Sequence, residues 1–176
     1  RSRAVHFLQE FASAQLATRH LHVSVPAQRV RWIPPISPHY KVNYDGALFN
    51  DLGAAGLGVI IRDSDGCVIG ALAERISLPS SVATVEALAC RRAVQFALEL
   101  SVFDAIFEGD AEIVTKALHE GVSNHPDFGL VVTDSLRLAT AFRFCHFSHV
   151  KRLGNTVAHL LARSSKSGNE LQVWME

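Results

Sequence analysis

The chain has 176 residues, of which 48% are hydrophobic and 19% carry a charge. This composition supports one compact domain with a core of its own and excludes a chain that is disordered throughout. No apolar run approaches the roughly 20 residues that a membrane-spanning helix needs, so we expect no membrane partner.

The zero net charge conceals an uneven distribution of charged residues. Residues 1–41 hold six Lys or Arg against one acid, and residues 143–169 hold five against none. Residues 42–142 carry six basic and fourteen acidic side chains. An acidic middle between basic ends suits a metal site with phosphate-binding margins. Random scatter of surface charge fits the same counts, so charge alone decides nothing.

The cysteines and the first residues of the chain indicate the cellular compartment in which the protein is expected. Cys67, Cys90 and Cys145 form no closely spaced pair, and each lies in an apolar pattern. We expect three small core residues and a reducing compartment inside the cell. The sequence begins with Arg and shows no charged-then-apolar leader, so we expect no secretory signal and read the chain as a fragment of a longer product.

Two segments are expected before the main domain. Residues 1–22 are predicted to form an N-terminal helical arm, because their apolar residues share one face and no Pro or Gly interrupts them. Residues 23–39 contain four prolines and are predicted to be an extended linker. The main domain is then expected at 40–168, followed by a C-terminal tail at 169–176.

The main domain is expected to begin with three strands. From Tyr40, alternation puts Lys41, Asn43 and Asp45 on one face of the first strand and the intervening apolar residues on the other. Residues 53–63 and 67–76 are two further strand-like runs, joined by a hairpin turn at 63–66.

Helices and strands then alternate. Residues 81–100 are the clearest helix, with an apolar stripe at helical spacing. In chain order we then expect a strand at 104–108, helices at 111–120 and 128–141, a strand at 142–150 and a helix at 155–165. A meander followed by alternating elements indicates an α/β domain, with a mixed sheet and helices packed on its faces.

Three acidic side chains stand out by their positions. Asp45 lies in an otherwise apolar strand, although it could also be a turn residue before Gly46. Glu86 points along the apolar stripe of its helix, where a buried carboxylate needs a partner, although an exposed margin fits too. Asp110 follows a strand and could simply cap the next helix.

Together these carboxylates could converge on hard cations that prefer oxygen ligands. Two Mg²⁺ ions about 3.5–4 Å apart would clamp the attacking and leaving oxygens of a phosphodiester hydrolysis. Spacing alone makes such a site plausible and no more.

Five segments, in order, resemble the plant RNase H-like (reverse-transcriptase-like) family found in plant non-LTR retrotransposon polyproteins. They begin at Lys41, Gly56, Val85, Phe107 and Asn155 and read KVNYDGA, GLGVIIRD, VEALA, FEGD and NTVAHLLAR. The resemblance implies an RNase H-like fold, with a five-stranded mixed sheet made of a three-strand antiparallel meander plus two parallel strands, and helices on both faces. It also implies cleavage of the RNA strand of RNA–DNA hybrids with two Mg²⁺ or Mn²⁺ ions.

By motif position, the resemblance makes Asp45, Glu86 and Asp110 catalytic metal ligands. Active relatives carry Asp where this chain has His159, which we therefore take as the fourth catalytic residue and metal ligand. Histidine can ligate a metal, but it suits Zn²⁺ or Mn²⁺ better than Mg²⁺, so weakened catalysis is expected. A helix histidine without a metal role remains the alternative.

Further residues are candidates for contact with nucleic acid: Asn43, Gly46, Gly56, Lys151 and Arg152. The glycines around Gly56 suggest close approach to the minor groove of a hybrid, or a sheet bulge. Lys151 and Arg152 precede the last helix and suit phosphates, although surface charge explains them equally. We therefore expect a hybrid or another nucleic acid as partner, for a monomer or a part of a larger polyprotein. A catalytically reduced binding module and a retroelement relic remain open.

Overall fold

The structure is a computed structural model that describes residues 31–121 and 125–176. The predicted helical arm and the first part of the predicted linker lie outside the described residues. None of the helices in the described ranges has the length and apolar character that crossing a membrane requires.

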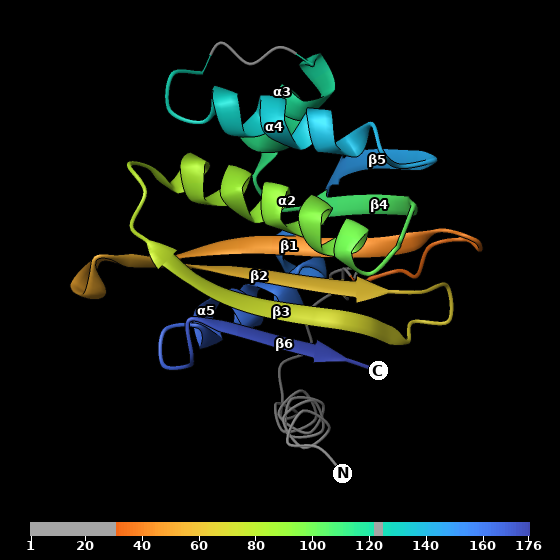
Figure 1. Cartoon of the computed structure of the whole chain (residues 1–176), viewed down its shortest axis with the longest axis horizontal. Coiled ribbons are helices and arrows are strands. Elements are labelled where there is room, and N and C mark those ends of the chain that lie inside the picture. Colours follow the sequence, from red (N-terminus) through yellow and green to blue (C-terminus); the bar gives the residue numbers. More distant parts are fainter. Residues whose placement is uncertain (1–30, 122–124) are drawn as a thin grey trace, which may run out of the picture.

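Within these ranges, six strands form one mixed sheet in the order β5-β4-β1-β2-β3-β6 (Figure 1). Strands β1, β2, β3 and β6 pair in antiparallel fashion, whereas β4 and β5 run parallel to β1. The strands are β1 (Tyr40–Phe49), β2 (Ala54–Arg62), β3 (Val68–Ser77), β4 (Asp104–Gly109), β5 (Phe144–His149) and β6 (Leu171–Met175).

Helices cover both faces of the sheet, with α2, α3 and α4 on one side and α5 on the other (Figure 1). Their bounds are α2 (Val82–Glu99), α3 (Glu112–Glu120), α4 (Gly129–Ala139) and α5 (Thr156–Ser164). Two short 3₁₀ turns, η1 (Asn50–Leu52) and η2 (Arg152–Gly154), follow β1 and precede α5. The predicted fold class is confirmed, although the number of strands is not.

The sixth strand corrects the prediction of a five-stranded sheet with a tail at 169–176. Strand β6 pairs with β3 over the register from Gly70 opposite Met175 to Glu74 opposite Leu171. Its inward Trp174 packs with a small apolar cluster between β2, β3 and α5. In the structure, residues 171–175 alternate exposed and half-buried side chains, but their sequence LQVWM does not alternate apolar and polar residues and so gave no strand signal.

The glycines of β2 explain how closely α5 approaches the sheet. A Cβ atom at Gly56 would lie 2.1 Å from the carbonyl oxygen of Ala162, and one at Gly58 would lie 2.2 Å from that of Ala158. The prediction that Gly56 faces nucleic acid is therefore replaced by a packing role: it lets a helix lie directly on the strand. The irregularity in β2 lies elsewhere, between Ile61 and Arg62.

The described end of the predicted linker is docked onto the domain through Trp32. The Trp32 ring stacks on the Arg62 guanidinium at 3.7 Å, and its Nε1 donates to Oδ1 of Asn43 at 2.9 Å. Arg62 donates to the same oxygen, and the Asn43 amide donates to Glu108, which also pairs with Lys41. Asn43 is fully buried with its side chain engaged, so this structure gives it a structural role instead of the predicted nucleic-acid contact.

The cysteines follow the prediction in part. Cys90 is buried and Cys145 is half-buried, but Cys67 is exposed just before β3, at the end of the hairpin turn. The prediction that Cys67 is a core residue is wrong, because a turn-flanking position points to solvent even within an apolar run.

Candidate metal centre

Three elements bring Asp45, Glu86 and Asp110 together. Strands β1 and β4 are parallel neighbours with Asn43 opposite Glu108, so Asp45 and Asp110, each two residues further along, lie side by side. Gly46 allows α2 to approach β1, since a Cβ there would lie 2.6 Å from Val85, and this contact places Glu86 beside the strand. Each carboxylate offers one oxygen, and these three atoms all lie within 4.8 Å of one another.

Two oxygens of this triad are buried without a hydrogen-bond partner among the described residues. They are Oδ1 of Asp45, whose residue is fully buried, and Oε2 of Glu86, whose residue is 8% exposed. A buried carboxylate oxygen without a donor is costly unless a cation satisfies it. The residues present therefore fit a divalent cation held by oxygen ligands.

The raised pKa values of the triad also indicate a site for a cation. Burial, followed by the charges of Glu86 and Asp110, raises the pKa of Asp45 to about 9. Burial and Asp110 raise the pKa of Glu86 to about 8, partly offset by a backbone hydrogen bond from Gly46. Three carboxylates at this separation cannot all ionise at neutral pH without added positive charge.

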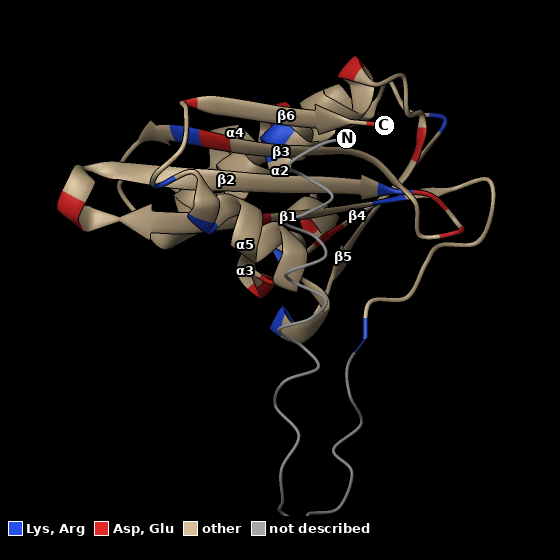
Figure 2. Cartoon of the chain, turned by 90° about the horizontal axis from the view of Figure 1, so that it is seen from below, with Lys and Arg blue, Asp and Glu red and all other residues tan. Residues whose placement is uncertain are grey.

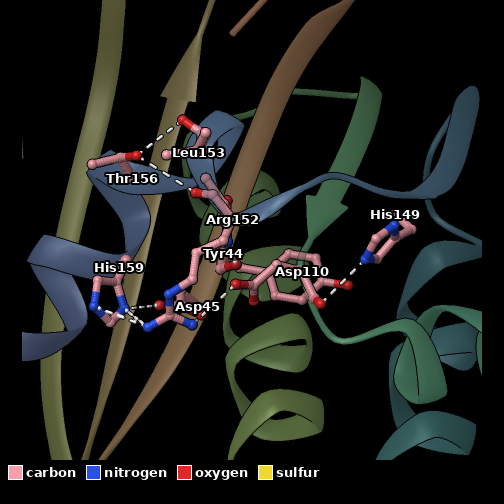
Figure 3. A network of polar contacts seen from close by, with 9 residues as sticks. Tyr44, Asp45, Asp110, His149, Arg152, Leu153, Thr156 and His159 are labelled. Carbon is pink, nitrogen blue, oxygen red and sulfur yellow. Dashed lines mark hydrogen bonds and ion pairs between the residues drawn. The ribbon is translucent and has the colours of Figure 1, made fainter. Parts of the chain in front are cut away.

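His159 lies beside the triad and contacts one of its members. Its Nδ1 is 2.6 Å from Oδ2 of Asp45, which links α5 to β1 (Figure 3). Burial and the nearby charges of Arg152 and Arg163 lower the pKa of His159, so its ring is neutral at pH 7. Among the described residues the cluster of possible ligands comprises the three carboxylates, and His159, the predicted fourth ligand, lies within hydrogen-bond distance of the first of them.

Arg152 reaches across the opening of the site. Its Nη1 lies 3.2 Å from Oδ2 of Asp110, and its Nη2 lies 3.1 Å from each ring nitrogen of His159 (Figure 3). The side chain of Lys151 is exposed and makes no hydrogen bond or ion pair within the described ranges. The two neighbouring basic residues, predicted together as phosphate contacts, thus differ: one faces the carboxylates and the other faces solvent.

Asn155, the residue before α5, connects that helix to strand β1. Its amide donates to the carbonyl oxygen of Tyr44 at 2.8 Å instead of capping its own helix. The bond joins the start of α5 to β1 one residue before Asp45, and so fixes the helix that carries His159.

A groove of about 330 Å³ extends from the triad between β1, the start of α2 and α5. Gly46 and Glu86 line it near the triad, and Val82, 59% exposed, lines it further out. Its basic side chains are those of Arg152, Arg163 and Lys166.

The last two of these basic residues were missed by the sequence analysis. Arg163 lies in the last turn of α5 and Lys166 follows just after that helix, and their spacing of three residues was the available signal. Figure 2 shows acidic and basic positions spread over many elements.

A mixed sheet with helices on both faces and an acidic triad beside its central strand defines an RNase H-like domain. The chain belongs to the reverse transcriptase-like family, whose model matches residues 43–165. No curated protein matches the sequence.

Solved structures with this fold support the assignment. RNase H1 from the archaeon Halobacterium salinarum is 25% identical, with a TM-score of 0.67 over 73% of this chain and 97% of that chain. The N-terminal RNase H domain of a Mycobacterium tuberculosis protein is 22% identical, with a TM-score of 0.65 over 72% and 92% of the two chains.

Two further structures contain nucleic acid. LC11-RNase H1 in complex with RNA/DNA hybrid is 18% identical, with a TM-score of 0.63 over 71% of this chain and 94% of that chain. A foamy viral protease-reverse transcriptase in complex with RNA/DNA hybrid is 13% identical, with a TM-score of 0.58 over 86% of this chain and 23% of that chain. At these identities the likeness shows the fold.

Proposed function

We propose that this chain is a metal-dependent endonuclease that hydrolyses the RNA strand of RNA–DNA hybrids. The observation that carries the proposal is the triad of Asp45, Glu86 and Asp110, whose oxygens lie within 4.8 Å of one another. The unpartnered buried oxygens of Asp45 and Glu86 call for a cation there. Structures that share the fold include RNases H and complexes with hybrid.

The residues of the site have different roles in the proposed reaction. Asp45, Glu86 and Asp110 would hold two Mg²⁺ or Mn²⁺ ions, and bound ions supply an activated water and neutralise charge on the departing 3′ oxygen. Gly46 donates its backbone N–H to Glu86 and holds that carboxylate toward the triad. His159 orients Asp45 through the hydrogen bond between them.

The substrate would be held by the groove beside the triad. The guanidinium of Arg163 and the ammonium of Lys166 suit the phosphates of one strand. The apolar wall that includes Val82 offers sugars and bases a surface free of charge. Since Asn43 and Gly56 are engaged inside the fold, the binding surface consists of Gly46, Lys151 and the basic residues of the groove.

A catalytically reduced nucleic-acid-binding module is the second candidate. A specific observation favours it: the position where active relatives carry Asp holds His159, which contributes no negative charge and whose ring contacts Asp45 and Arg152. Fewer negative charges weaken the binding of a second divalent ion. This candidate predicts hybrid binding without turnover.

The deciding experiment is cleavage of a labelled hybrid by purified protein with Mg²⁺ or Mn²⁺. The enzyme proposal expects cutting within the RNA strand that disappears in Asp45→Asn and Asp110→Asn and persists in Lys116→Ala, a change on the exposed surface of α3. Binding without cutting at high Mn²⁺, with cutting recovered in His159→Asp, would establish the module instead. Absence of hybrid binding even at low salt would favour a relic without activity.

The chain is further proposed to act as a segment of a polyprotein of the plant non-LTR retrotransposon kind. Its motif order supports this origin, and the foamy viral protein shows a similar fold within a much longer chain. Mass spectrometry of the native protein would test it by giving the length of the chain in which these residues occur.

A further inference from the structure

Arg152 contacts a carboxylate of the triad for which a bound metal ion would compete. Its Nη1 lies 3.2 Å from Oδ2 of Asp110, and the same guanidinium rests against His159 (Figure 3). The charge of Arg152 also lowers the pKa of Asp45 and of Glu86, although burial outweighs this effect. The guanidinium therefore acts as positive charge for the whole triad when no metal ion is bound.

The ion pair between Arg152 and Asp110 has features that allow another ligand to replace it. The Arg152 side chain is 64% exposed, whereas that of Asp110 is 10% exposed. A single nitrogen faces a single carboxylate oxygen, so the pair lacks the geometry of two parallel hydrogen bonds. Exposed pairs of this kind contribute little to stability, and rotation of one long side chain is enough to open them.

We infer that Arg152 is a displaceable counter-ion of Asp110, which leaves the carboxylate when a divalent cation binds and passes its guanidinium to a substrate phosphate. The inference rests on the metal-binding part of the proposed function. A divalent ion at Asp110 would lie close to the guanidinium, and the two positive charges would repel each other.

The groove supplies the second position of the side chain. Arg152 lines the groove together with Arg163 and Lys166. A phosphate bound between these residues would therefore lie close to the guanidinium of Arg152. A guanidinium presents the same planar donors to phosphate as to carboxylate. The exchange therefore substitutes one hydrogen-bonded anion for another.

A coupling between the two ligands follows. A phosphate that draws Arg152 away leaves Asp110 free for metal, and a metal ion that displaces Arg152 frees it for phosphate. Each ligand should therefore raise the affinity of the other by the same factor.

The first measurement is calorimetric titration of Mn²⁺ into metal-free protein. Arg152→Ala should bind Mn²⁺ about fivefold more tightly than the wild type, the factor expected from losing one exposed competing charge. Arg152→Lys keeps the charge and should stay close to the wild type. Arg137→Ala removes an equally long, exposed arginine on α4 and should change nothing. Thermal unfolding in EDTA checks that each variant is folded.

The second measurement repeats the titration with a hybrid whose RNA strand carries 2′-O-methyl groups, so that it binds without being cut. The hybrid should raise the Mn²⁺ affinity of the wild type severalfold and that of Arg152→Ala much less. Equal or weaker Mn²⁺ binding by Arg152→Ala would overturn the inference.

The outcomes separate the inference from the proposed function. Cleavage by the wild type with unchanged Mn²⁺ affinity in Arg152→Ala overturns the inference alone. Tighter Mn²⁺ binding in that variant, without cleavage by the wild type, leaves the inference standing and overturns the enzyme. No Mn²⁺ binding by any variant overturns both.

Discussion

The Nδ1 atom of His159 lies 2.6 Å from Oδ2 of Asp45, and this contact joins the last helix, α5, to the central strand β1. The imidazole is neutral, because burial and two nearby arginines lower its pKa. It therefore partners one carboxylate of the triad without adding the negative charge that a fourth carboxylate would bring.

Replacement of this histidine, His159→Asp, should strengthen metal binding and weaken the metal-free fold. A fourth carboxylate adds a charged oxygen ligand, so Mg²⁺ affinity should rise by about tenfold or more. Without metal, the new carboxylate repels Asp45 and leaves its oxygen without a partner, which should lower the free energy of unfolding by about 2 kcal/mol. Calorimetry and urea denaturation in EDTA measure the two effects.

His159→Asn is the matched control, since it offers an amide and no charge. It should lower Mg²⁺ affinity or leave it unchanged. Equal tightening by Asn and by Asp would show that ligand charge is not the cause.

The stability of the metal-free protein should fall as the pH rises from about 4 to about 9. Burial and like charges raise the pKa of Asp45 from 3.8 to about 9 and that of Glu86 from 4.5 to about 8. Between the unfolded and folded values, the folded protein binds more protons than the unfolded chain, so the free energy of unfolding decreases with pH. Urea denaturation in EDTA at a series of pH values measures the slope.

Neutral variants test the cause of that slope. Asp45→Asn and Glu86→Gln should each flatten it, and saturating Mg²⁺ should oppose it by neutralising the ionised triad. A metal-free stability that rises over this pH range would contradict the assignment of raised pKa values.

Loss of the basic groove residues should weaken hybrid binding in a salt-dependent way. Arg163→Ala should reduce the slope of log affinity against log salt by about 0.9, the value for one phosphate contact to a duplex, and Lys166→Ala should also reduce it. Lys166 also pairs with Asp51 at 2.8 Å, so its effect should be the smaller of the two. Fluorescence anisotropy with the uncleavable hybrid gives the slopes.

Lys116→Ala on α3 is the control for the groove. Its side chain is 74% exposed and pairs with Glu120 on the same helix. A salt slope that falls as much in this variant as in Arg163→Ala would mean that nucleic acid does not select the groove.

Gly58→Ala should separate α5 from the sheet. The added Cβ would lie 2.2 Å from the carbonyl oxygen of Ala158, and backbone on both sides leaves little room to adjust. We expect a loss of about 3 kcal/mol in the free energy of unfolding, the upper end for overpacking.

The control is Gly53→Asn, at a position with open space and a left-handed backbone that Asn tolerates. It should cost less than about 1 kcal/mol. Equal losses at the two positions would argue against close helix packing as the reason for glycine in β2.

Local patterns in the sequence were enough for most of the fold. Apolar periodicity predicted the long helix now seen as α2, and the turn at 63–66 predicted the hairpin between β2 and β3. Motif order pointed to Asp45, Glu86 and Asp110, which the structure brings within reach of one ion. The helix and the hairpin depend on residues that are neighbours along the chain. The triad could be predicted because its motifs occur in a characteristic order.

Tertiary structure alone decided what each side chain touches. Asn43, Gly56 and Arg152 looked alike as candidates for nucleic-acid contact. In the structure, Asn43 belongs to a buried hydrogen-bond network, Gly56 allows a helix to pack on its strand, and Arg152 faces the carboxylates. Strand β6 joins the sheet because β3 offers it an edge, which no local pattern reveals. The sequence by itself determined which residues could do chemistry. Packing between distant segments decided their partners, because burial and charge at a site are sums over residues far apart in the chain.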